Sequence, residues 1–167
     1  MSSHIYMSGK AYYDVQNLWS LAEKKAIERL YTLDYFDELL DPCWDEGVRP
    51  IEIIEQKKGE HWTRCEEADL SYAILIGPKN EIIDGRHRLA KLFSHKIHCF
   101  NAKIFASCSE MTEAEIFPLC PKCGSVCFIT TINPDSFTCR DMGHWLGDFD
   151  EVRWGKTQQH SDCVCKV

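Results

Sequence analysis

The sequence has no apolar run approaching the roughly 18 residues that a membrane-spanning helix needs, so we expect no membrane partner. It also lacks a positively charged start that leads into an apolar segment. We therefore expect no secretory signal and a cytoplasmic location. Basic residues are not in excess, because the formal net charge of the 167 residues is -7. A protein that coats nucleic acid non-specifically is usually basic, so the overall charge argues against that class.

The charge is unevenly distributed along the chain. Between Glu23 and Glu60 there are eleven acidic residues and six Lys or Arg. Between Lys79 and Lys103 the balance is reversed, with six Lys or Arg, two acids and three histidines. Such a local basic patch fits an anionic small ligand, or one track of nucleic-acid phosphates, better than an extended duplex.

Apolar periodicity and turn residues predict an α+β fold. Helical spacing extends over residues 15–40, in one helix or two. Residues 57–70 are polar and predict a loop with room for one helical turn. Further elements are predicted from short apolar runs and from the flanking Gly and Pro residues: strands at 72–77, 82–84 and 99–105, a helix at 86–95, and a helix or strand after Pro50.

A glycine and three basic residues stand at the predicted turn between the strand at 82–84 and the helix after it, in the order Asp84, Gly85, Arg86, His87, Arg88. Cations in the first turn oppose the helix dipole, at a cost of about 0.3–1 kcal/mol each. A bound anion reverses this sign, because each charge-assisted hydrogen bond contributes about 1.5–3 kcal/mol. The pattern therefore predicts a phosphate site at Gly85, Arg86, His87 and Arg88.

The helical wheel separates the roles of the three basic residues. Arg86 falls on the same stripe as Leu89 and Phe93, so its stem is expected to pack and its head to emerge at the edge. His87 and Arg88 are then the better ligand candidates. In the alternative interpretation, Asp84 pairs with Arg88 and the triplet is a solvated helix start.

Residues 61–105, and above all the D-G-x-H-R motif at 84–88, resemble the ParB/sulfiredoxin superfamily and its small ParB-like proteins. The resemblance implies a mixed-sheet α+β domain in which the motif opens a helix and holds nucleotide phosphates. Sulfiredoxins carry a reactive cysteine where Arg86 stands, which argues against sulfinic-acid reduction. No longer arginine-rich box or helix-turn-helix follows, which argues against a sliding DNA clamp.

Acidic residues near the motif are candidates for catalysis if a phosphoryl group is transferred. Asp84, Glu67 and Asp69 could hold Mg²⁺ with a nucleoside triphosphate, or accept a proton. Each could equally be an ordinary surface or capping acid. His61, with Trp62, could stack on a base.

Six of the ten cysteines lie at or after Cys120, which suggests a separate module. In a cytosolic protein such clustering indicates metal more often than disulfides. The C-P-K-C-G knuckle and the later F-T-C-R-D-M-G-H segment predict a structural zinc ion held by Cys120, Cys123, Cys139 and His144. Cys127, Cys163 and Cys165 remain alternatives for the fourth ligand.

These observations predict four segments: a ParB/sulfiredoxin-like domain over residues 1–106, a linker helix over 107–118, a zinc-ribbon-like module over 119–150 and a flexible tail over 151–167. The leading hypothesis is a nucleotide- or phosphate-binding protein, with NTP hydrolysis or phosphoryl transfer, in DNA-related metabolism or regulation. One alternative is a nucleic-acid-binding or nuclease-like adaptor. Another is a phage or mobile-element factor that binds a protein partner, through the ribbon or otherwise.

Overall fold

The computed structural model describes residues 4–8, 11–44, 47–119, 127–129, 136–139, 145–148 and 153–156. The chain divides into two compact units. One is continuous, Val15–Glu113, and the other joins Met1–Asp14 to Ala114–Val167. No helix in the described ranges is long and apolar enough to span a membrane.

The continuous unit is built on a four-stranded mixed sheet, so the expected α+β class is confirmed. The strands are β3 (Glu28–Tyr31), β4 (Ile74–Ile76), β5 (Ile82–Asp84) and β6 (Cys99–Ile104), in the order β3-β6-β4-β5. The pair β4 and β6 is parallel, and the other two pairs are antiparallel. A hairpin joins β4 to β5, and α4 (Arg86–Ser94) then carries the chain across to β6.

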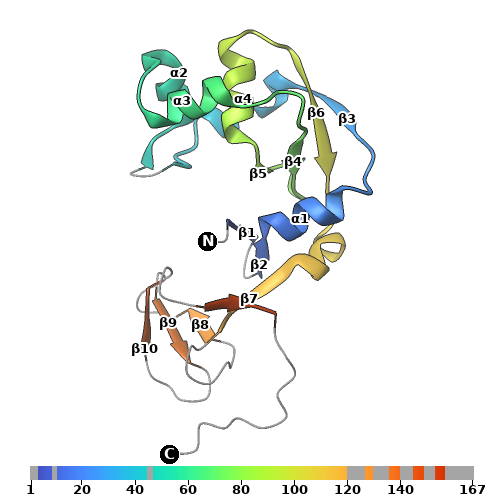
Figure 1. Cartoon of the computed structure of the whole chain (residues 1–167), viewed down its shortest axis with the longest axis vertical. Helices are drawn as coiled ribbons and strands as arrows, with labels where there is room; N and C mark the ends of the chain where they lie inside the picture. Colours follow the sequence, from blue (N-terminus) through green and yellow to red (C-terminus); the bar gives the residue numbers. More distant parts are fainter. Residues whose placement is uncertain are drawn as a thin grey trace, which may run out of the picture. The chain divides into compact units, whose positions relative to one another are not determined.

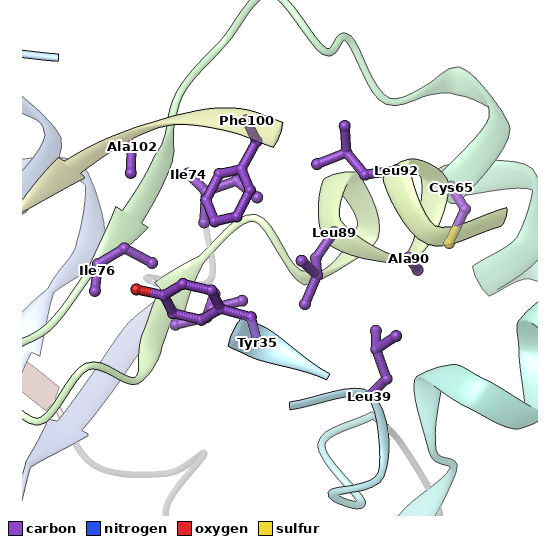
Figure 2. Packing of buried hydrophobic residues seen from close by; sticks show 11 residues of the cluster. Tyr35, Leu39, Cys65, Ile74, Ile76, Leu89, Ala90, Leu92, Phe100 and Ala102 are labelled. Carbon is purple, nitrogen blue, oxygen red and sulfur yellow. The ribbon is translucent and has the colours of Figure 1, made fainter. Parts of the chain in front are cut away.

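Helix α4 packs against this sheet, and α2 (Pro50–Gln56) and α3 (Glu60–Glu67) pack against α4 (Figure 1). Their apolar side chains meet those of the strands in one core (Figure 2). Leu89 of α4, Cys65 of α3 and Ile76 of β4 are fully buried there. This packing fixes α4 against the sheet and so fixes the turn at which α4 begins.

The helix α1 (Val15–Ala22) lies on the opposite face of the sheet. Side chains alternate along a strand, so Lys103 points away from the face that holds Ala102. Its ammonium donates to the carbonyl oxygen of Ala22, at the end of α1, over 2.6 Å. Leu18 and Ala22 are fully buried.

The predicted helical region at 15–40 is wrong at residues 28–31, and the expected second short helix is present only as 3-10 helix. Residues 28–31 form β3, and two 3-10 segments follow, η1 (Thr32–Tyr35) and η2 (Asp37–Leu39). Pairing with β6 satisfies the backbone of 28–31, and Leu30 still packs against the core from the strand. Residues 57–70, expected as a loop with one helical turn, contain the longer helix α3, which buries Cys65.

The second unit consists of short strands. One sheet has the order β1-β2-β7-β11 and the other β10-β9-β8. The strands are β1 (Ile5–Ser8), β2 (Ala11–Asp14), β7 (Glu115–Leu119), β8 (Cys127–Ile129), β9 (Ser136–Cys139), β10 (Trp145–Asp148) and β11 (Arg153–Gly155).

The segment 107–118, expected as a linker helix, holds the 3-10 helix η4 (Cys108–Ala114) and most of β7. Alternating burial along β7 shows why: Ile116 and Pro118 are buried, whereas their neighbours are less so. The period of two belongs to a strand. Strand β11 lies inside 151–167, which was expected as a flexible tail.

Candidate functional site

The turn between β5 and α4 depends on a glycine. Gly85 has φ of 111°, in the left-handed region that side chains rarely adopt. A Cβ atom at this position would lie 3.1 Å from Ile74 Cγ1 and 3.1 Å from Arg88 Nε. The Gly85 carbonyl accepts the first helical hydrogen bond, from Leu89 N at 2.9 Å. The backbone therefore turns directly into α4, with the first amides of the helix next to a glycine.

A pocket of about 240 Å³ opens at this turn. It joins the segment after α3 to the end of β5 and the first turn of α4. Its lining includes four of the five motif residues and two of the three predicted catalytic acids, since Asp84 belongs to both sets: Ala68, Asp69, Tyr72, Asp84, Gly85, His87 and Arg88.

Arg88 is held at the pocket wall by two groups. Its Nη2 donates to Asp84 Oδ2 over 2.9 Å, and its guanidinium carbon lies 5.6 Å from the centre of the Trp19 ring. Trp19 Nε1 also donates to Asp84 Oδ2, over 2.9 Å. The ion pair between Asp84 and Arg88 is thus present. Both of these hydrogen bonds end on Oδ2 of Asp84.

His87 is stacked and partly buried. Its imidazole lies 4.6 Å from the Trp44 ring centre at an interplanar angle of 12°. Its Nε2 lies 3.2 Å from His61 Nδ1. Burial, and then the neighbouring His61 and Arg64, lower the pKa of His87 from 6.5 to about 4. His87 is therefore neutral at physiological pH, and it can contact an anion as a hydrogen-bond donor but not as a cation.

Arg86 lies away from the pocket lining, as the helical wheel predicts. Its Nη2 donates to Glu38 Oε2 over 3.1 Å, and Glu38 Oε1 accepts a hydrogen bond from the backbone of Ile82. The Arg86 Nε atom is buried and has no hydrogen-bond partner among the residues that the structure describes. Arg86 thus ties α4 to η2, whereas His87 and Arg88 face the pocket.

The predicted catalytic acids separate in the structure. Asp69 lines the pocket, and a hydrogen bond from Ser71 N at 2.8 Å lowers its pKa. Asp84 lines it too, whereas Glu67, the last residue of α3, is exposed and is not among the lining residues. The charged groups of the lining are thus two carboxylates and one guanidinium, beside a neutral imidazole. A bare phosphate would meet net negative charge unless a cation accompanied it.

Three aromatic residues of this region were not predicted as part of it. Trp44 belongs to a segment that carried only turn signals, and Trp19 to the apolar pattern of α1. Tyr72 was assigned to a buried strand, yet its side chain is 67% exposed and it lines the pocket. The strand begins only at Ile74. The signal in the sequence that could have indicated this role of Tyr72 is an aromatic residue shortly before a strand.

Most of the predicted zinc ligands lie outside the described residues, namely Cys120, Cys123, His144, Cys163 and Cys165. Cys139 is the last residue of β9, and its backbone is directly opposite that of Cys127 in β8. In the described ranges, no group of three or more His, Cys, Asp or Glu side chains could hold a metal ion.

Comparison of the chain with protein-family models, with curated proteins and with solved structures found no match.

Proposed function

We propose that this protein binds a phosphate-containing ligand, in particular a nucleotide with its divalent cation, in the pocket at the turn between β5 and α4. The observation that carries the proposal is the pocket itself. It places Gly85, His87 and Arg88 on one wall, at the start of a helix whose first amides lack partners within the helix. The resemblance of 61–105 to ParB/sulfiredoxin-like domains supports the same ligand class and the same fold.

The charge balance of the pocket favours a phosphate that arrives with Mg²⁺. Asp69 and Asp84 supply the hard oxygen ligands that Mg²⁺ prefers. The cation would offset their charge, and Arg88 and His87 would then donate to phosphate oxygens. The same two acids are positioned to serve a hydrolysis or phosphoryl-transfer reaction, by holding the metal or by accepting a proton.

Tyr72 gives the pocket an aromatic edge. Its side chain is mostly exposed while it lines the pocket, so a ring face is available to a ligand. Stacking of a base on an aromatic side chain contributes about 1–3 kcal/mol and does not depend on base identity. A nucleotide with its phosphates at Gly85 and its base at Tyr72 would contact both of these lining residues.

The test is a calorimetric titration of the purified chain with Mg·ATP, Mg·GTP, Mg·CTP and Mg·UTP. Arg88→Ala should abolish binding while circular dichroism shows that the fold is kept. Arg29→Ala is the matched control, because it removes one exposed arginine from β3, which contributes no residue to the pocket lining. Chelation of Mg²⁺ should weaken binding to the wild-type chain. Equal affinity of the wild-type chain and Arg88→Ala for every nucleotide would refute the proposal.

We also propose that the module following β7 is a zinc ribbon held by Cys120, Cys123, Cys139 and His144. The three-stranded antiparallel sheet β10-β9-β8 supports this, as does the facing position of Cys127, which keeps that residue a candidate for the fourth ligand. So small a module buries little apolar surface, and a structural metal would supply the missing stability.

A further inference from the structure

Two histidines meet on one face of a tryptophan beside the pocket. The His61 and His87 rings lie 4.5 Å and 4.6 Å from the centre of the Trp44 ring, at interplanar angles of 6° and 12°. The two imidazole centres are 5.4 Å apart. Imidazoles on opposite faces of the indole would be roughly 7–9 Å apart, because each ring plane lies about 3.5 Å from the indole plane. Both rings therefore lie on the same face, edge to edge.

The 3.2 Å contact between His61 Nδ1 and His87 Nε2 requires a single shared proton. Two lone pairs or two N–H groups would repel each other at this distance, so one imidazole donates and the other accepts. If His61 donates, neutral His87 carries its own proton on Nδ1. If His87 donates, its Nδ1 carries a lone pair. His87 lines the pocket and His61 does not. Since Nε2 of His87 is paired with His61, Nδ1 of His87 is the ring nitrogen left for a ligand.

The surrounding charges favour the arrangement in which His61 donates and His87 carries its proton on Nδ1. The charged and titratable groups that act on His87 are His61 and Arg64 from α3, Asp84 from β5, and Arg88 from α4. The pocket side carries Asp69 and Asp84 against a single guanidinium, so an N–H that points there is favoured. Arg64 lies one helical turn beyond His61 on α3, and its positive charge favours a lone pair on the side of His87 that faces α3.

We infer that His61 is a positioning residue: its Nδ1–H donates to His87 Nε2 and so holds His87 in the tautomer that presents Nδ1–H to the pocket. The inference rests on the proposed function, because that N–H is placed to donate to a phosphate oxygen. Trp44 fixes the plane of both rings. His87 is then a neutral anion donor and not the general base, which leaves proton acceptance to the pocket carboxylates.

The experiment is ¹⁵N NMR of the full chain labelled at histidine, at pH 7, without ligand and with Mg·ATP. A His87→Gln variant identifies the His87 signals among those of the seven histidines. We expect a protonated Nδ1 and an unprotonated Nε2 in the ligand-free protein. His61→Phe keeps an aromatic ring against Trp44 but removes the donor. We therefore expect His87 to populate both tautomers in this variant, and affinity for Mg·ATP to fall by about two- to tenfold.

His61→Asn provides the rescue, because its amide N–H lies near the place of His61 Nδ1–H. It should restore the Nδ1–H tautomer of His87 and most of the affinity. A proton on His87 Nε2 in the wild-type protein would overturn the inference, and so would an unchanged tautomer in His61→Phe. The tautomer of the ligand-free protein decides the role of His61. Binding of the nucleotide panel by the wild-type chain decides the proposed function, so either can fail alone.

Discussion

Acidification should destabilise this protein through His87. The expected change in the free energy of unfolding follows from the surroundings of that residue. The pKa of His87 is about 4 in the folded chain, below its ordinary value of 6.5. Between these two pH values the unfolded chain takes up a proton that the folded chain does not. The free energy of unfolding therefore falls as the pH drops from 6.5 to 4, and this contribution is fully present only above pH 6.5.

Each pKa unit corresponds to about 1.4 kcal/mol. Without solvent screening, the shift of the His87 pKa from 6.5 to about 4 would therefore lower the free energy of unfolding by roughly 3.4 kcal/mol. The imidazole is only partly buried, and solvent screening reduces the expected loss to about 1–2 kcal/mol. Below pH 4 both states carry the proton, and no further loss comes from this residue.

The assay is urea denaturation, followed by circular dichroism, at a series of pH values between 7 and 4. His87→Phe keeps a ring against Trp44 and removes the titration. The difference in unfolding free energy between the wild-type chain and this variant should shrink by about 1–2 kcal/mol across the series. Carboxylates titrate in both proteins and cancel in the difference. His98→Gln is the control, because that side chain is exposed. A difference for His87→Phe that stays constant from pH 7 to 4 would refute the reasoning.

Two further predictions concern the glycine turn and the zinc ions. Gly85→Ala should lower the free energy of unfolding by about 2–3 kcal/mol, because it combines a strained φ with close contacts to Ile74 and Arg88. Gly59→Ala also has a positive φ but meets nothing within 4 Å, so urea denaturation should show a loss of only about 1 kcal/mol. Native mass spectrometry should find one zinc ion per chain, and none in Cys120→Ser. The exposed Cys108 provides the control, since Cys108→Ser should keep the metal.

Local signals were sufficient for the segment that contains the motif. The apolar run before Pro78, the apolar pair before Asp84 and the spacing of Leu89 and Leu92 predicted β4, β5 and α4 to within two residues. Each of these signals lies within a few positions of the element that it predicts. The role of Gly85 was also predictable from local sequence, because the turn itself requires its positive φ.

The surroundings of His87 could not be predicted in this way. Trp44, His61 and His87 come from a loop, from α3 and from α4, and they meet only because these segments pack against one another in the folded chain. Similarly, Leu30 has a helical spacing to its neighbours along the chain but is paired through β3 with Phe100. Such contacts depend on tertiary packing, which overrides local spacing.

The pairing of β2 with β7 has a consequence for the order of events during synthesis. Tyr12 lies opposite Ile116, so the first strands wait for about a hundred further residues before their partner leaves the ribosome. At roughly 5–20 residues per second, that wait lasts about 5–20 s. The whole of 15–113, with its own sheet and core, is complete before then. The nascent chain can thus form the half that carries the pocket first, while the edge of the N-terminal hairpin is still exposed to chaperones and to other nascent chains.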